Sequence, residues 1–357
     1  MYSHLENGSY NILTIPFMLF STTQKLYPYP NGWYVIAKSG DIKPNQVVTK
    51  AFMGEEIIVF RTEQGHISVM HAYCPHLGAH LGFGGKVIGE NIKCPFHDFQ
   101  FDTTGTCVKT GYDTPPPAKC RVPTWQAQER NGFVWAWHDA KNNAPDWEIP
   151  QIDWAGWSPL MTHEWTLKSH PQETSENSVD IGHFSIVHGY KSVEVLKESE
   201  IDGAFLKAKY AIHRDADFMG KKGNIIRAEF DAIVMGLGCS FVEVLIPSFG
   251  IETRNYVFAR PLDGETISLT IAMSVKKIAN PSKIHPLLSL VPQKWLNKLI
   301  LYFTFKGYKN DVYQDFFVWE NKKHIPHPAL AKGDGPVGLY RRYVRQFYYA
   351  DVVKEWG

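Results

Sequence analysis

Two short segments, each carrying one cysteine and one histidine, constrain this 357-residue chain more than any other feature. The first holds Cys74 and His76, and the second, after seventeen intervening residues, holds Cys94 and His97. Two thiolates and two imidazoles can bind a zinc ion or a 2Fe–2S cluster. Zinc fingers pair their cysteines about two to four residues apart, whereas each segment here supplies one ligand of each kind. This distribution favours a cluster in which one iron takes both thiolates and the other takes both imidazoles.

Glycines and prolines surround these four residues and fit two tight loops that approach inorganic sulfur closely. They are Pro75, Gly78, Gly82, Gly84, Gly85 and Pro95. With CPHLGAHLGFGG in the first loop and CPFHDF in the second, the segment resembles the Rieske iron–sulfur proteins. The resemblance implies a 2Fe–2S cluster held by Cys74, His76, Cys94 and His97. A zinc site or unliganded side chains are the alternative interpretation.

The length of the chain predicts two domains, and its composition is that of an ordinary globular protein. Lys and Arg number 37 against 36 Asp and Glu, so no basic field indicates nucleic-acid binding. The five cysteines are too few and odd in number for a disulfide framework, and we expect Cys107, Cys120 and Cys239 to be free thiols. Free thiols and a proline-broken apolar run at 11–20, too short to span a bilayer, predict a cytoplasmic protein, at most peripheral to a membrane.

The order of predicted elements indicates an α+β chain with three parts. Residues 1–30 read as an arm that packs on the catalytic domain, 31–140 as a small all-β domain, and 141–357 as a larger domain. Short β-branched and aromatic runs predict strands in the small domain at 33–37, 56–60, 66–70 and 133–137.

Alternating strands and several helices are expected in the larger domain, after a linker rich in Pro and Trp at 142–159. The strands at 206–212 and 267–275 alternate, which predicts one buried face and one solvated face. Helices are predicted at 172–188, 293–306, 311–323 and 339–353. The helix at 293–306 is read as amphipathic, and it either faces the core, caps a pocket or touches a membrane.

A second ligand pattern, D-x2-H-x4-H, comprises Asp180, His183 and His188. Two imidazoles and a carboxylate with open coordination positions form the facial triad used for Fe(II) and dioxygen. On a regular helix five residues turn roughly 140° beyond a full circle, so the two histidines would not share a face. They can bind one ion if the helix ends, or carries a π-bulge, between them. Gly182 and Gly189 would make either distortion of the helix easier.

Together the two patterns resemble the Rieske non-haem iron oxygenases, from about Trp33 to the C-terminus. The resemblance implies that His183 and His188 bind a mononuclear iron. It implies that Asp180 links this iron to the Rieske cluster of a neighbouring subunit, and that Asn177 lies beside the iron.

The third iron ligand should be a carboxylate from a distant helix, and Asp311, Asp315 and Glu320 are candidates. Asp311 and Asp315 lie one turn apart on one helical face, so geometry leaves the choice open. The family's terminal pattern of Asp, then Trp, then a Lys-bearing stretch matches Asp315 with Trp319 and 322–323, and we predict Asp315 with Asp311 as the alternative.

The resemblance also implies partners. Electrons would come from NAD(P)H through a separate reductase or ferredoxin, because the chain lacks a dinucleotide-binding fingerprint. Family members place the two centres of one chain too far apart for fast transfer and form head-to-tail trimers, so a homotrimer is expected.

Four stretches narrow the class of substrate. The loops CPHLGAHLGFGGKVIG and IKCPFHDFQF resemble the cholesterol 7-desaturase group, whereas ENSVDIGHF and GDGPVGLYRRYVRQFY resemble the oxygenase component of 3-ketosteroid 9α-hydroxylase. We therefore expect O2-dependent hydroxylation, or alternatively desaturation, of a steroid or sterol. A Rieske electron-transfer protein and a zinc-binding interaction module are the readings from other classes, and the sequence leaves the carbon attacked and the reductase open.

Overall fold

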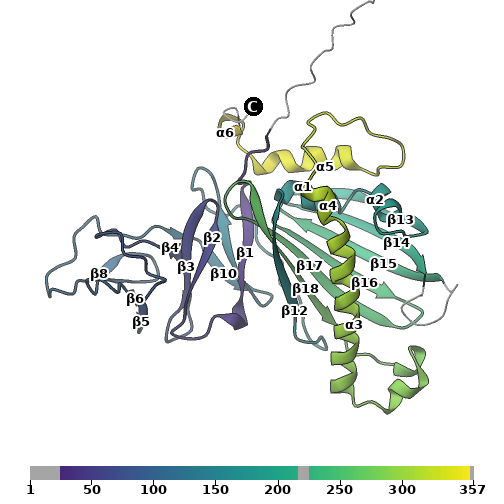
Figure 1. The fold of residues 1–357 in the computed structure, drawn as a ribbon, viewed down its shortest axis with the longest axis horizontal. Coiled ribbons are helices and arrows are strands. Elements are labelled where there is room, and N and C mark those ends of the chain that lie inside the picture. The colour runs from purple at the N-terminus through teal and green to yellow at the C-terminus, as the bar shows by residue number, and fades with distance from the viewer. Residues whose placement is uncertain (1–24, 216–224, 354–357) are drawn as a thin grey trace, which may run out of the picture.

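The computed structural model describes residues 25–215 and 225–353 (Figure 1). The apolar run at 11–20 and most of the expected arm over 1–30 lie outside the described residues. The last part of that arm contacts the larger domain. The imidazole Nε2 of His170 lies 3.0 Å from the carbonyl oxygen of Tyr27, and Lys25 pairs with Glu265 at 3.2 Å.

Three small antiparallel sheets form the N-terminal unit. The strands expected at 33–37, 56–60, 66–70 and 133–137 are all present, as β1, β3, β4 and β11. The first sheet has the order β1 (Gly32–Lys38), β11 (Phe133–His138), β10 (Ala127–Arg130), and the second has the order β2 (Val47–Phe52), β3 (Glu55–Arg61), β4 (Ile67–His71), β9 (Thr124–Trp125). The third, which carries the Cys/His loops, has the order β5 (Lys86–Ile88), β6 (Asn91–Lys93), β7 (Gln100–Phe101), β8 (Cys107–Lys109).

A seven-stranded antiparallel sheet dominates the C-terminal unit. Its order is β12 (Met161–Lys168), β18 (Thr266–Val275), β17 (Ile251–Pro261), β16 (Cys239–Ile246), β15 (Ile225–Met235), β14 (Phe205–Asp215), β13 (Ser192–Asp202). The long helix α3 (Gln293–Gln314) crosses one face of this sheet (Figure 1). On the other face, aromatic side chains of β1 and β11 pack against β16 and β17 in one apolar cluster.

The expectation of a solvated face on the strand at 267–275 is wrong. Ile267, Leu269 and Ile271 pack under α3 as expected, but Ser268 and Ser274 on the opposite face are also buried. Ser268 donates to Glu164 of β12, and Ser274 donates to the backbone of Ser158 at 2.7 Å. The N-terminal unit and the linker cover this face, and polar side chains tolerate burial there because they are hydrogen-bonded.

The expected helices differ from the observed ones in their limits. The segment 172–188 contains two short helices, α1 (Pro171–Glu176) and α2 (Gly182–Ile186). α3 runs without interruption through Gly307, so the separate helices predicted at 293–306 and 311–323 are wrong; only α4 (Phe316–Trp319) follows. The tail forms α5 (Val337–Tyr343), η5 (Val344–Phe347) and α6 (Ala350–Val353). η1 (Ser39–Asp41), η3 (Pro281–Lys283) and η4 (Pro286–Leu290) are 3-10 turns.

The expected fold class is confirmed, since a small all-β unit precedes an antiparallel sheet flanked by helices. None of the five cysteines forms a disulfide, and Cys107, Cys120 and Cys239 are free thiols as expected. Among the helices that the structure describes, none combines the length and the apolarity needed to cross a bilayer.

Candidate metal centres

The two Cys/His loops lie side by side at the tip of the β5–β8 sheet. Cys74 and Cys94 are almost fully buried, at 2% and 1% exposure, and their side chains are within hydrogen-bonding contact. The rings of His76 and His97 face the same region, with centroids 4.7 Å apart. Each loop thus supplies one thiol and one imidazole, and the two thiols lie together, as do the two imidazoles, which suits a cluster with two different irons.

The backbone of each loop closes on itself and fixes these side chains. Cys74 N–H donates to the carbonyl of Ala79 at 2.9 Å, and Cys94 N–H donates to the carbonyl of Phe99 at 2.8 Å. The Phe99 ring stacks on His76 at 4.4 Å with the planes 4° apart. Burial raises the pKa of the Cys74 thiol to about 12, and the neighbouring Cys94 adds to this effect. Two buried thiols in contact form a donor set that cationic iron would favour in the deprotonated form.

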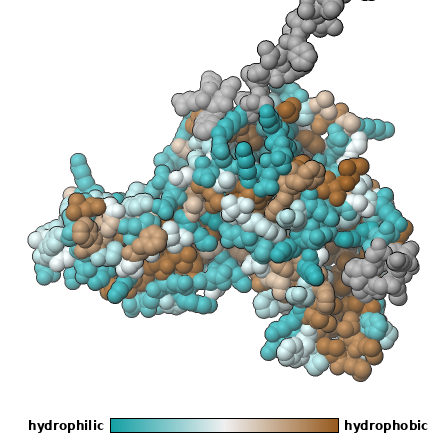
Figure 2. All heavy atoms as spheres, in the orientation of Figure 1, coloured by the Kyte–Doolittle hydropathy of each residue, from teal (hydrophilic) through white to brown (hydrophobic). Residues whose placement is uncertain are grey.

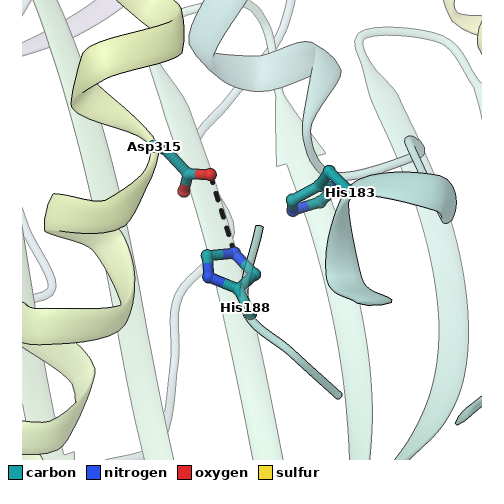
Figure 3. A group of neighbouring side chains, drawn as sticks. All are labelled: His183, His188 and Asp315. Atoms are coloured by element: carbon teal, nitrogen blue, oxygen red, sulfur yellow. Dashed lines mark ion pairs between the residues drawn. The ribbon is translucent and has the colours of Figure 1, made fainter. Parts of the chain in front are cut away.

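A second group of ligand atoms forms where α2 meets the end of α3. Donor atoms of His183, His188 and Asp315 all lie within 4.8 Å of one another (Figure 3). Nε2 of His188 lies 3.6 Å from Oδ1 of Asp315, and the two imidazole centroids are 5.1 Å apart. Two imidazoles and one carboxylate on one side of an ion would leave its other side open.

Local backbone explains how the two histidines meet. α2 ends at Ile186, before His188, which is the interruption that the spacing requires. Gly189, directly after His188, has a φ of +67°, a conformation that glycine adopts at little cost and that changes the direction of the chain there. His183 therefore projects from the first turn of α2 and His188 from the segment beyond it.

Hydrogen bonds fix the ring orientation of both histidines. Nδ1 of His183 donates to the backbone carbonyl of Asp180, and Nδ1 of His188 lies 2.9 Å from Oε1 of Gln314, which can only accept. Each bond places the proton on Nδ1 and leaves Nε2 as the free donor atom, the usual arrangement behind a metal-bound histidine. Burial lowers the pKa of His183 to about 4, so its imidazole is neutral at pH 7.

The surroundings of Asp315 disfavour a negative charge on its carboxyl group. Burial, together with the carboxylates of Asp311 and Asp180, raises its pKa to about 7, although a hydrogen bond from Asn177 opposes this rise. The Asn177 amide also accepts from the Trp319 indole at 3.3 Å, which fixes it between α1 and α4. A divalent cation beside neutral imidazoles would offset this charge, so the residues present fit an iron ion.

The other carboxylate candidates do not join this group. Oδ2 of Asp311 accepts from Arg214 at 3.0 Å and from the hydroxyl of Tyr190 at 3.3 Å. Glu320 is exposed beyond α4. Asp180 lies at the edge of the group, where its Oδ1 accepts from the backbone N–H of His183 at 3.2 Å.

A cavity of about 350 Å³ opens beside His183, His188 and Asp315. Side chains of β14 to β18 and of α3 line it, and most of them are apolar. The polar minority of the lining includes Ser240, Asn255 and the charged Arg214. A space of this size and lining suits a rigid apolar molecule that would lie next to the three donors.

Two features of this site were not anticipated. Gln314 orients His188, and no sequence pattern reports a contact across 126 residues. A buried ionic network also ties α1 to the tail. In it, Glu173 pairs with Lys322 at 2.6 Å and with His324 at 2.8 Å, and Glu176 pairs with Arg341 at 2.5 Å.

The fold and the two donor sets together define a Rieske non-haem iron oxygenase, an oxidoreductase with a 2Fe–2S cluster and a mononuclear iron that uses O2. Residues 32–126 match the Rieske [2Fe-2S] domain family, and residues 136–348 match the 3-Ketosteroid 9alpha-hydroxylase C-terminal domain family. Because the second match alone covers more than half of the chain, the protein belongs to the Rieske oxygenases with this C-terminal domain. The expected family, enzyme class and cofactors are confirmed.

Curated relatives carry the names of both expected groups. Cholesterol 7-desaturase nvd of Drosophila melanogaster is 28% identical over 350 residues, covering 90% of this chain and 75% of that protein. Cholesterol 7-desaturase nvd of Hemicentrotus pulcherrimus is 30% identical, covering 90% and 70%. The oxygenase component of 3-ketosteroid-9-alpha-monooxygenase of Rhodococcus rhodochrous is 29% identical, covering 90% and 84%.

Solved structures share the fold at low identity. A Pseudomonas putida CBB5 NdmA mutant with caffeine superposes with a TM-score of 0.64 at 18% identity, covering 88% of this chain and 89% of that one. Dicamba monooxygenase bound to dicamba gives a TM-score of 0.63 at 17% identity, covering 89% and 97%. These similarities show a common architecture.

Proposed function

We propose that this protein is the oxygenase component of a multicomponent system that hydroxylates a steroid or sterol. The observation that carries the proposal is the apolar cavity beside His183, His188 and Asp315. An iron at this group would supply open positions for O2, and the cavity would hold an apolar polycyclic substrate next to them. The names of the relatives support this substrate class.

Each candidate residue takes a role in this proposal. Cys74, His76, Cys94 and His97 bind the 2Fe–2S cluster, and His183, His188 and Asp315 bind the iron. Asp180 and Asn177 act beside the iron: Asp180 positions His183 through its backbone carbonyl, and Asn177 orients the Asp315 carboxylate. The apolar lining keeps bulk water from the substrate.

We also propose the domain limits 31–140 and 141–357, with the arm at 1–30 packed on the catalytic domain. β11 ends at His138 and pairs with β1, so the chain leaves the N-terminal unit close to residue 140. The contacts of Lys25 and Tyr27 support the place of the arm.

We also propose a head-to-tail homotrimer, and the placement of the two centres supports a head-to-tail arrangement. The Cys/His loops lie at one end of the long axis of the chain and α2 lies on the far side of the large sheet (Figure 1). Apolar side chains are exposed around the loops, with Phe83 at 72% and Phe96 at 60%, and Ile186 in α2 is 86% exposed. We propose that the loops of one subunit dock against α2 of the next, with Asp180 between the centres.

Electrons would come from NAD(P)H through a separate reductase or ferredoxin, in the cytoplasm. We further propose that the protein works peripherally at a membrane, because apolar sterols partition into bilayers.

Desaturation is the second candidate, favoured by the several cholesterol 7-desaturases among the relatives. Both reactions can begin with removal of the same hydrogen, so products must separate them. The reconstituted protein, with a reductase and NADH, would be incubated with a panel of 3β-hydroxysterols and 3-ketosteroids. A product that gains one oxygen supports hydroxylation, and one that loses two hydrogens supports desaturation. O2 consumption that no steroid stimulates would refute the substrate class.

A further inference from the structure

Large apolar side chains are exposed on the outer surface of α3 and of the turn before it. We call them the α3 patch: Leu287, Leu290, Trp295, Leu299, Tyr302 and Phe303. Each exposes between 40% and 80% of its surface. In Figure 2, hydrophobic residues gather at the lower end of α3, where η4 joins it. A contiguous patch of this kind marks an interaction surface more often than an ordinary exterior.

The α3 patch is separate from the face of the helix that packs on the sheet. Trp295, Leu299 and Tyr302 recur at helical spacing on the outer face. Leu296 and Ile300, each one position further along, are buried under the helix in the core cluster. α3 is therefore apolar on two faces, which corrects the amphipathic interpretation of 293–306. Only one of these faces packs against the core.

Positive charge surrounds the α3 patch. Residues 277–310 contain six lysines and no Asp or Glu, so this segment carries +6 in a chain whose net charge is +1. Lys283, Lys294, Lys298 and Lys306 are exposed and have no acidic partner among the described residues. Nζ of Lys298 lies 5.3 Å from the centre of the Trp295 ring, so charge and aromatic surface are intermixed.

This combination fits an anionic membrane surface better than a second copy of the chain. Exposed Trp, Tyr and Leu beside lysines suit the interface of a bilayer with anionic headgroups, where the rings sit at headgroup level and the ammonium groups meet phosphate and carboxylate. A second copy docked by the same face would bring these lysines against one another, which opposes association.

The α3 patch also reaches the cavity of the active site. Phe303 is 57% exposed and lines the cavity, as do its neighbour Thr304 and, one turn further on, Gly307. From there the cavity follows α3 to Asp311 and Asp315. One side chain therefore belongs both to the apolar exterior and to the wall beside the proposed iron.

We propose that the α3 patch binds the surface of an anionic membrane and that the apolar substrate enters the cavity from the bilayer past Phe303. The membrane contact rests on the exposed surface and its charge alone. The delivery step rests on the proposed steroid or sterol substrate.

Flotation of the full-length holoprotein with vesicles tests the contact. The parent should float with vesicles of phosphatidylcholine and phosphatidylserine, less with phosphatidylcholine alone, and less again at high salt. The double variant Leu290→Ser/Trp295→Ser should bind about tenfold more weakly. Ile325→Ser/Leu330→Ser is the matched control, because both residues are about half exposed and lie beyond the opposite end of α3.

Three results would overturn the proposed contact. The parent could remain with the aqueous fraction, the Leu290/Trp295 variant could float like the parent, or light scattering could show that this variant changes the number of subunits. The last result would assign the α3 patch to an interface between copies.

Delivery has its own test. The Leu290/Trp295 variant should turn over steroid supplied in cyclodextrin at the parental rate and steroid embedded in vesicles several-fold more slowly. Equal rates from both sources, or equal slowing, would contradict delivery from the bilayer. If the parent turns over no steroid from either source, the proposed function fails, while the flotation result still decides the membrane contact.

Discussion

The two metal sites of this chain are built in different ways. The Cys/His loops draw the four proposed cluster ligands from residues 74–97, and each loop is closed by its own backbone hydrogen bonds. The iron group draws His183 and His188 from one segment and Asp315 from the end of a helix far along the chain. The first site depends on local loop geometry, whereas the second depends on how α3 packs across the large sheet. The two should therefore respond to separate mutations.

The largest effect is expected from removing one iron ligand. His183→Ala should reduce turnover below about one per cent of the parent, because the iron is lost, and should leave the visible spectrum of the cluster unchanged. Steady-state O2 uptake and the absorption spectrum measure the two sites separately. His327→Ala, at an exposed position, is the control. An active His183→Ala protein would remove this residue from the ligand set.

A matched pair one helical turn apart sharpens the choice of the third ligand. Asp315→Asn should lose the mononuclear iron, whereas Asp311→Asn should keep it and lose only the negative charge that faces Arg214. The ratio of iron to acid-labile sulfide, measured in each variant, distinguishes them. Loss of iron from the Asp311 variant alone would assign the ligand to Asp311.

The proposed link between subunits predicts an intermediate effect. Asp180→Asn keeps an oxygen that can accept from the His183 N–H, so the iron should remain. Electron arrival at the iron should slow by about tenfold to a hundredfold, since the carboxylate between the centres is gone. Single-turnover kinetics of the reduced protein give this rate. A parental rate with full iron content would argue against the bridge.

A smaller effect is expected at the residue behind His188. Gln314→Leu removes the acceptor for Nδ1 and should weaken iron binding about tenfold to a hundredfold. Gln314→Glu restores an acceptor and should recover most of the affinity. Iron titration of the metal-free protein measures both, and an identical affinity in all three proteins would show that the contact has no role.

Acid should destabilise the C-terminal unit even with the iron site unchanged. Burial lowers the pKa of His170 from 6.5 to about 4, while this ring caps α1 and bonds to Tyr27. As pH falls below 6.5, His170 becomes protonated in the unfolded chain but stays neutral in the folded chain. The free energy of unfolding therefore falls until about pH 4, by roughly 3 kcal/mol.

Urea unfolding of His170→Asn should show a shallower pH dependence than the parent. His66→Asn, at an exposed ring, should not; identical slopes in all three would refute the assignment.

The contrast between the sites also separates what the sequence could and could not predict. The Cys/His loops could be predicted from the sequence because the ligand types, their spacing and the turn residues all lie within one segment. The spacing of His183 and His188 also required a helix end between them, which the structure has at Ile186. The choice between Asp311 and Asp315 stayed open because periodicity puts both on one face.

Contacts between distant parts of the chain account for the features that the sequence left open. Arg214 and Tyr190 bind Asp311, while Asn177 and His188 face Asp315. Burial of the second face of β18 was equally hidden, because the covering surface belongs to β1 and β11 in the other unit. The continuation of α3 through Gly307 was missed because one glycine costs a long helix only about 1 kcal/mol, which packing on the sheet offsets.

Metal analysis of the purified chain tests the central claim most directly. Two kinds of iron predict about three iron atoms and about two acid-labile sulfides per chain, with a visible spectrum of a histidine-ligated cluster. His183→Ala should keep the sulfide and lose about one iron. Purified chain that contains zinc and no acid-labile sulfide would contradict the account. So would a parent protein with the same iron content as His183→Ala.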